Sequence, residues 1–291
     1  ANIVYYFEKK DVMDNCIVIL ADAGKPALHH YLAPYVGMTL AEYFSKKHKR
    51  DVLVVFDDLS NHAVAYREMS LLMRTSPARE AYPGDIFYAH ARLLERSGAF
   101  MGSGSITALP IAQLQDDDIT GYISTNLISI TDGQMFFDTK LFNSGILPAI
   151  NTELSVSRVG GSAQPESIRK LSGALRLNLA EYHELSVFLQ FGGDLDDETL
   201  SKLKVGSLLV SLMNQTVGMN YTVADEFLIL FLFKNYNLEL QEKKDHVLYI
   251  KWLIDFVKLA YEDVYIELNK GFVPSKKIMS ELKEIIEGSI T

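Results

Sequence analysis

The spacing of apolar residues changes along the chain and divides it into two parts. In the first part, short runs of branched apolar residues alternate with stretches that have helical spacing. The runs are nearly continuous, which is typical of strands buried on both faces of a parallel sheet. The predicted strands are residues 16–20, 52–56, 120–130 and 134–137, and the predicted helices between them include residues 66–73 and 90–96. This alternation predicts an α/β layer architecture.

From about Gln164 onward, strand signals disappear and apolar residues recur at steps of three and four, as on one face of a helix. Pro165 suits the start of the first helix, which residues 192 and 193, both glycine, are expected to end. Residues 194–199 offer capping side chains for the next helix. Further helical patterns cover residues 200–213, 223–235, 247–269 and 275–287. We expect two domains, residues 1–164 and 165–291, the second an all-α helical bundle.

Composition narrows the classes of protein that fit this pattern. Of the 291 residues, 48% are hydrophobic and 22% are charged, which is typical of a soluble globular protein and excludes a disordered chain. The formal net charge is −9, and no dense positive cluster of the kind that nucleic acid or anionic lipid requires is visible. The short basic run of residues 46–50 is interpreted as a solvated loop face. We expect no nucleic-acid partner.

Cysteine, histidine and membrane signals exclude further classes. The single cysteine, Cys16, cannot form an intrachain disulfide or a zinc cage, and its apolar neighbours predict an inert core thiol. His29, His30 and His90 lack metal-binding spacing and are expected at the surface or as satisfied core groups. The longest uninterrupted apolar segment, residues 227–233, is far shorter than the roughly 20 residues that span a bilayer. We therefore expect no direct membrane insertion.

The most informative local motif is the apolar strand at residues 52–56, which ends in Asp57 and Asp58. In open α/β sheets, ligands bind at the carboxyl ends of strands, where an acidic side chain can hold phosphate-bound Mg²⁺ through water. The motif resembles a Walker B strand, although an acidic turn after a strand is also common. Its usual partner, a glycine-rich phosphate loop ending in lysine, is missing, because residues 102–105 (Gly-Ser-Gly-Ser) lack the lysine. Either the site binds no nucleotide, or its first half lies on another polypeptide.

A longer series of motifs favours the second alternative. Residues 148–158 read Pro-Ala-Ile-Asn-Thr-Glu-Leu-Ser-Val-Ser-Arg, which matches the signature shared by the α and β subunits of F-type ATP synthases. Blocks similar to those of α subunits follow in α-subunit order at residues 31–35, 56–60, 63–67, 79–85, 92–96, 129–134 and 155–160. The chain therefore resembles the α subunit of F-type, mitochondrial ATP synthase. The resemblance is dense from residue 28 to 164 and thinner beyond, where residues 194–196 (Asp-Leu-Asp) are the main anchor.

The resemblance implies a fold and a cellular setting. An α subunit consists of a β-barrel, a nucleotide-binding domain and a helical C-terminal domain. This chain would be the C-terminal portion of a RecA-like P-loop nucleotide-binding domain, without its phosphate loop, followed by the helical bundle. We expect a natural C-terminal fragment of a split or processed α chain, with a cloning truncation as the alternative. The expected location is the matrix side of the mitochondrial inner membrane, as a peripheral protein.

The resemblance also implies roles for individual residues. Arg158 corresponds to the arginine finger that α contributes to the neighbouring β active site, where a guanidinium can stabilise charge on the transferring phosphoryl group. Ser129 corresponds to a serine that faces the same site. Asp57 corresponds to the Walker B acid that binds Mg²⁺ at the noncatalytic site of α, whereas Asp58 could orient the adjoining loop. Outside such a motif, an arginine in an ion pair and a serine in a turn are the ordinary interpretations.

Phe142, Pro148 and Gln215 are implied to form the adenine pocket of that noncatalytic site, which would bind ATP or ADP. An aromatic ring and a proline can sandwich a purine, and an amide can bind its edge. The sequence departs from the family at Leu147, where arginine is usual, and at Met213, where a second glutamine is expected. The loss of these two polar contacts is expected to weaken the affinity or selectivity for a purine. The alternative is that Phe142, Pro148 and Gln215 are ordinary core residues.

The implied function is that of a subunit in the catalytic head of a proton-translocating ATP synthase. The partners would be the N-terminal fragment of α, β subunits, the γ subunit of the central stalk and peripheral-stalk subunits. The isolated chain is not expected to be active. One alternative is a noncatalytic subunit of a related rotary or secretion ATPase, reused as a binding or scaffold protein. Another is a freestanding α/β enzyme that holds a metal with Asp57 and Asp58.

Overall fold

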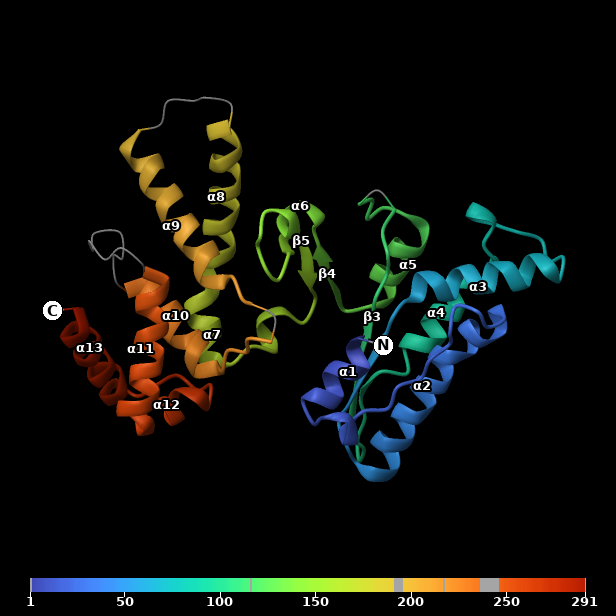
Figure 1. The fold of residues 1–291 in the computed structure, drawn as a ribbon, viewed down its shortest axis with the longest axis horizontal. Helices are drawn as coiled ribbons and strands as arrows, with labels where there is room; N and C mark the ends of the chain where they lie inside the picture. The colour runs from blue at the N-terminus through green and yellow to red at the C-terminus, as the bar shows by residue number, and fades with distance from the viewer. Residues whose placement is uncertain (1, 116, 191–195, 217, 236–245, 291) are drawn as a thin grey trace. The chain divides into compact units, whose positions relative to one another are not determined.

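The protein is represented by a computed structural model that describes residues 2–115, 117–190, 196–216, 218–235 and 246–290 (Figure 1). By its internal contacts the chain divides into two compact units, Ala1–Asp132 and Gly133–Thr291. The domain boundary that the sequence suggests, between residues 164 and 165, stays a prediction.

A small sheet with helices forms the first unit. Its strands are β1 (Val52–Phe56), β2 (Gly98–Ala99) and β3 (Ser105–Pro110), in the order β1-β3-β2. The first and third strands run parallel, with Val52 opposite Ile106 and Phe56 opposite Pro110, and β2 is antiparallel to β3. The helices are α1 (Asn2–Lys9), α2 (Ala27–His48), α3 (Leu59–Leu72), α4 (Ile86–Leu94) and α5 (Tyr122–Ile130), with 3₁₀ turns at Met13–Asn15 and Arg79–Ala81.

The core of this unit lies where α2 and its neighbouring helices cover the β1–β3 pair. Its buried side chains include Met38 from α2, Leu59 from α3 and Phe56 at the end of β1. Burial alternates along β1, and Leu53 and Val55 are 62% and 54% exposed. The prediction of a strand buried on both faces is therefore wrong for β1. Among the described residues, the face with Val52 and Val54 packs against the core, whereas the face with Leu53 and Val55 is exposed.

Two of the predicted strands in this unit are wrong. Residues 120–130 contain the helix α5, in which Thr125 and Ser129 donate side-chain hydrogen bonds to carbonyls one turn earlier. The apolar residues of this run, Ile123 and Leu127 among them, are spaced for one helix face as well as for a buried strand. Residues 16–20 have no regular secondary structure, and Leu20 is 82% exposed. Cys16 is likewise partly exposed rather than a core thiol.

The second unit begins with a β-hairpin. Its strands are β4 (Gly133–Phe137) and β5 (Ile150–Ser157), which pair antiparallel with Gly133 opposite Ser157. The short helix α6 (Thr139–Asn143) lies between them. Gly133 has a φ of 154°, and a Cβ atom there would lie 2.3 Å from the backbone oxygen of Val156. Only glycine allows this close approach of the two strands.

The other regular elements among the described residues of the second unit are helices. They are α7 (Glu166–Leu171), α8 (Leu175–Gln190), α9 (Asp197–Met213), α10 (Val223–Asn235), α11 (His246–Ala260), α12 (Glu262–Asn269) and α13 (Lys276–Ile290), with 3₁₀ turns at Gly160–Ser162 and Ser172–Ala174. No strand follows β5 in the part of the chain that the structure describes, which agrees with the loss of strand signals after residue 164. The expected long helix over residues 247–269 is two helices, because the backbone leaves helical geometry at Tyr261. The predicted break at residues 192 and 193 lies outside the described residues.

The helical core is built mainly around α10. Its Leu228, Phe231 and Leu232 are buried together with Leu253 of α11 and Leu268 of α12. A buried acidic residue fixes the start of α10, because Asp225 and Thr222 bind each other's backbone N–H groups at 2.8 and 3.2 Å. The hydroxyl of Tyr265 on α12 also donates to Asp225, at 2.8 Å. This network joins two helices of the bundle.

None of the helices within the described residues is both long enough and apolar enough to cross a membrane.

Candidate functional site

Asp57 and Asp58, which directly follow β1, have different surroundings. Asp58 is buried and caps the N-terminus of α3, accepting from the backbone N–H of Asn61 at 2.6 Å and from its side-chain amide at 3.0 Å. The carboxylate of Asp57 is exposed at the carboxyl end of the strand. Since Asp58 is committed to the helix cap, Asp57 is the residue of the pair that is open to a ligand.

A magnesium site at Asp57 passes a limited chemical test. A single exposed carboxylate at the end of a strand suits Mg²⁺, which keeps several waters and takes its other ligands from phosphate oxygens. Within the described residues, no group of three or more histidine, cysteine or acidic side chains is arranged to hold a metal ion. Asp57 therefore fits the kind of Mg²⁺ site that a nucleotide helps to form, and does not fit a metal site built from protein ligands alone.

The turn that follows β1 is fixed by bonds to the end of β3. The backbone N–H of Ile111 donates to the carbonyl of Phe56, and the backbone N–H of Leu59 donates to the carbonyl of Ile111, both at 2.9 Å. The hydroxyl of Ser60 accepts from the backbone N–H of Gln113 at 2.9 Å. These bonds hold the two strand ends together, as expected for a binding edge of an α/β sheet.

Ser129 and Arg158 belong to different units. Ser129 is exposed in the last turn of α5, and its hydroxyl donates to the carbonyl of Thr125 at 2.8 Å. It is therefore a helical residue, whereas the sequence predicts the end of a strand. Arg158 is exposed and directly follows β5, whose last residue, Ser157, pairs with Gly133. Gly160 donates its N–H to the hydroxyl of Ser157 at 3.0 Å, so the turn that carries Arg158 is internally bonded.

The three residues expected around adenine lie on segments that the second unit joins. Gln215 donates its backbone N–H to the carbonyl of Leu147 at 2.7 Å, directly beside Pro148. Phe142 is on α6, and its carbonyl accepts from the backbone N–H of Gly145 at 3.0 Å. Both Phe142 and Pro148 are exposed, with Phe142 at 62%, so they are not core residues. An exposed aromatic ring, a proline and an amide are therefore held on neighbouring segments.

Asn214 makes this connection, and the sequence did not reveal its role. Its Oδ1 accepts from the backbone N–H of Leu147 at 3.0 Å, and its Nδ2 donates to the carbonyl of Gly145 at 3.1 Å. One side chain after the end of α9 is thus the hydrogen-bond partner of two backbone groups, the carbonyl of Gly145 and the N–H of Leu147. The only signal in the sequence was the position of Asn214 beside Gln215. Met213, where the family has a second polar group, is 42% exposed.

A buried histidine pair in the first unit also escaped prediction. Nδ1 of His62 and Nε2 of His90 are 3.1 Å apart, and the side chains are 2% and 0% exposed. Burial lowers the pKa of His62 to about 4 and that of His90 to about 3. Both rings are therefore neutral at pH 7. The buried Nδ1 of His90 has no hydrogen-bond partner among the described residues, so His90 is not the satisfied core group expected from the sequence.

Taken together, fold and site define a class of protein. A β1–β3 pair ending in an acidic turn, a hairpin carrying an exposed arginine and a helical bundle fit an α/β nucleotide-binding domain followed by a helical domain. Residues 1–157 match the family described as "ATP synthase alpha/beta family, nucleotide-binding domain". Residues 164–289 match "ATP synthase alpha/beta chain, C terminal domain". The chain belongs to the ATP synthase alpha/beta family.

Individual relatives are bacterial α subunits. "ATP synthase subunit alpha, sodium ion specific" of Acetobacterium woodii is 47% identical over 287 residues, which cover 99% of this chain and 57% of the relative. "ATP synthase subunit alpha" of Clostridium acetobutylicum is 47% identical over 294 residues, covering 100% of this chain and 57% of the relative. The subunit of Wigglesworthia glossinidia brevipalpis is 44% identical, over 96% of this chain and 58% of the relative. The chain thus spans 57–58% of the length of these relatives.

These relatives correct the expected cellular setting. The mitochondrial assignment is wrong, because the α subunits at 44–47% identity are from bacteria. The motifs that carry the resemblance belong to α subunits as a group and do not separate the two origins. The relatives also do not support protons as the transported ion, since one of them is named as sodium-ion specific.

Proposed function

We propose that the chain acts as an α subunit in the catalytic head of an ATP synthase. In this role it contributes Asp57, Phe142, Pro148 and Gln215 to a noncatalytic site for ATP or ADP. The observation that carries the proposal is the joining of segments 145–148 and 214–215 beside Phe142, in a chain that belongs to the ATP synthase alpha/beta family. An exposed ring and an adjacent proline suit the two faces of a purine.

Each group in this proposed site has a separate task. Bound Mg²⁺ would neutralise charge on the nucleotide phosphates. Asp57 would hold that ion through water, while Asp58 keeps the start of α3 in place by its cap. Phe142 and Pro148 would contact the base, and the Gln215 amide would bind its edge. The phosphates require a glycine-rich loop with lysine, which this sequence lacks, so we infer that it comes from another segment or polypeptide.

We further propose that Arg158 acts at the active site of a neighbouring β subunit. Its exposed position after β5 allows it to reach across a subunit interface, and Ser129 is proposed to face the same site. A guanidinium that contacts the transferring phosphoryl group would stabilise its charge in the transition state. The β subunits, the γ subunit and peripheral-stalk subunits are the proposed partners. Proton coupling stays a prediction.

Native mass spectrometry of the chain from its source tests this function. The expected result is a complex of several subunits that contains β-like chains and a further segment or polypeptide bearing the phosphate loop. Denaturing the complex would then give the mass of each component. If the chain is isolated as a stable monomer, the proposed function is wrong.

A further inference from the structure

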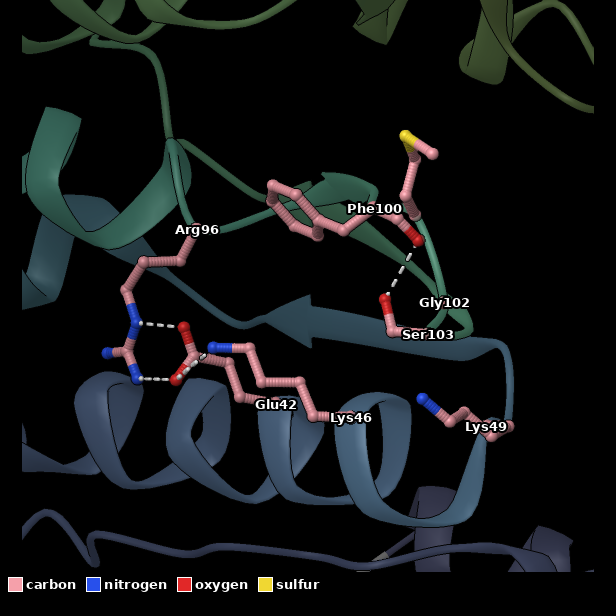
Figure 2. A pocket seen from close by; sticks show the side chains of 8 residues that line it. Glu42, Lys46, Lys49, Arg96, Phe100, Gly102 and Ser103 are labelled. Carbon is pink, nitrogen blue, oxygen red and sulfur yellow. Dashed lines mark hydrogen bonds and ion pairs between the residues drawn. The ribbon is translucent and has the colours of Figure 1, made fainter.

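A pocket with a volume of about 360 Å³ lies between the last turns of α2 and the segment between β2 and β3 (Figure 2). Asp57 is at the opposite end of β1, and none of the residues that line the pocket is assigned to nucleotide binding. Three cationic side chains, one carboxylate and two large apolar side chains line most of it.

The loop that lines the pocket is held against α2 by hydrogen bonds just beyond it. Ser45 on α2 donates its hydroxyl to the carbonyl of Gly104 at 2.6 Å and accepts the N–H of Gly104 at its own carbonyl, at 3.0 Å. A Cβ atom at residue 104 would lie 2.0 Å from the carbonyl oxygen of Arg50, so this approach requires glycine. The loop is thereby fastened to the end of α2, and the pocket is preformed rather than created by a ligand.

The charges in the pocket do not cancel. Arg96 binds the carboxylate of Glu42 with two nitrogens, at 3.0 and 3.1 Å, and Lys46 lies 3.8 Å from it. The pairing with Arg96 lowers the pKa of Glu42, so the carboxylate is ionised. One acid therefore faces the three cations Lys46, Lys49 and Arg96, which leaves a local positive excess in a chain whose net charge is −9. Figure 2 shows Lys46 turned toward Glu42 and Lys49 at the other end of the pocket.

The remaining lining is apolar and open to solvent. Phe100 is 49% exposed and Met101 is completely exposed. Methionine and aromatic side chains are enriched at the centres of protein interfaces. Because the cationic groups lie at two ends of the pocket with Phe100 between them in Figure 2, an extended ligand matches it better than a compact anion.

We propose that this pocket binds an acidic peptide segment of a partner polypeptide. A carboxylate of the segment contacts Lys49, and an apolar side chain of the segment covers Phe100 and Met101. This inference goes beyond the proposed nucleotide site and does not depend on it. The two are distinguishable, because the peptide test requires neither nucleotide nor β subunits.

The test measures peptide binding to the whole chain by fluorescence anisotropy. The probe is a fluorescein-labelled peptide of alternating glutamate with leucine and phenylalanine, compared with a peptide that has glutamine in place of each glutamate. We expect the acidic peptide to bind and the neutral one to bind at least about tenfold more weakly. Lys49→Glu should weaken binding of the acidic peptide by about tenfold, and Met101→Ser by about threefold.

Lys47→Glu is the matched control. Lys47 lies in the last turn of α2, two residues before Lys49, and undergoes the same charge change. It does not line the pocket, and its Nζ donates to the hydroxyl of Tyr43 at 3.2 Å. It should alter binding by less than about twofold. Equal losses for Lys47→Glu and Lys49→Glu would overturn the proposal, as would equal affinity for the two peptides. Pyrophosphate binding that depends on Lys49, without peptide binding up to about 1 mM, would also overturn it.

Discussion

At the scale of single residues, His62 and His90 couple the stability of the first unit to pH. Both folded-state pKa values lie below the ordinary value of 6.5, at about 4 and about 3, because burial disfavours the charged ring. The unfolded chain therefore binds protons that the folded chain excludes as the pH falls below about 6.5. Tyr31 stacks on His62, with ring centroids 5.0 Å apart, and this contact contributes to the burial.

We predict that the first unit is less stable at pH 5 than at pH 7. With two depressed pKa values, the free energy of unfolding should fall by about 2–4 kcal/mol between these pH values. Urea unfolding followed by circular dichroism at pH 7, 6 and 5 measures this change. The double variant His62→Leu with His90→Leu should show a shallower pH dependence, whereas His29→Leu, at an exposed histidine, should not. An unchanged slope in the double variant would contradict the prediction.

A second residue-scale prediction concerns Arg158. If its guanidinium stabilises the transferring phosphoryl group, Arg158→Ala should lower multisite ATP turnover of the assembled complex by about 10³-fold. Assembly should persist, because the side chain is exposed at the end of β5. Steady-state hydrolysis and native mass spectrometry of the same preparation measure the two effects. Arg176→Ala, at another exposed arginine, is the control. Normal turnover in Arg158→Ala would remove the proposed finger.

At the scale of elements, the end of α9 determines the position of the loop between α6 and β5. The connection depends on the two side-chain bonds of Asn214 and the backbone bond from Gln215 to Leu147. Residues 145–148 and 214–215 are far apart in the sequence, so the proposed base-binding groups meet only when the hairpin and the helical region are both folded. Local propensity does not contain this information.

We predict that Asn214→Ala loosens this connection. Loss of two exposed hydrogen bonds should lower the free energy of unfolding by about 1 kcal/mol. Urea unfolding of the whole chain measures the loss, and nucleotide titration of the assembled complex should show weaker binding at the noncatalytic site. Asn220→Ala is the matched control, because the side chain of Asn220 is exposed. Equal stability of the two variants would mean that Asn214 does not hold the loop.

At the scale of the whole molecule, the proposed nucleotide site needs a phosphate loop that this sequence does not contain. Asp57 is available at the end of β1, but the sequence contains no glycine-rich loop ending in lysine. Among the described residues, no cluster of three candidate metal ligands compensates for it. The alternative of a freestanding metal enzyme is decided by the activity of the chain alone.

We predict that the purified chain alone does not hydrolyse ATP in the presence of Mg²⁺, because it lacks a phosphate loop to hold and polarise the phosphates. A coupled phosphate-release assay measures this activity. Comparison with Asp57→Asn distinguishes intrinsic turnover from a contaminant. Turnover that Asp57→Asn abolishes would favour the freestanding enzyme over an ATP synthase subunit.

Several features of this protein could be predicted from its sequence. Helical spacing predicted α10 with both of its ends, Val223 and Asn235, and the apolar run Val52–Phe56 predicted β1. The ordered motifs predicted membership of the ATP synthase family, because each depends on residue type at fixed local spacing. These features share a physical basis, since hydrophobic period and turn chemistry act over one or a few turns of chain.

Other features depended on tertiary structure. The apolar run at residues 120–130 fits either a strand or a helix, and only its packing in the first unit decided for α5. Burial of His62 against His90 and the bonds from Asn214 to residues 145 and 147 join positions far apart in the chain. Such contacts depend on how whole elements pack, because the environment that shifts a pKa or satisfies a loop exists only after folding.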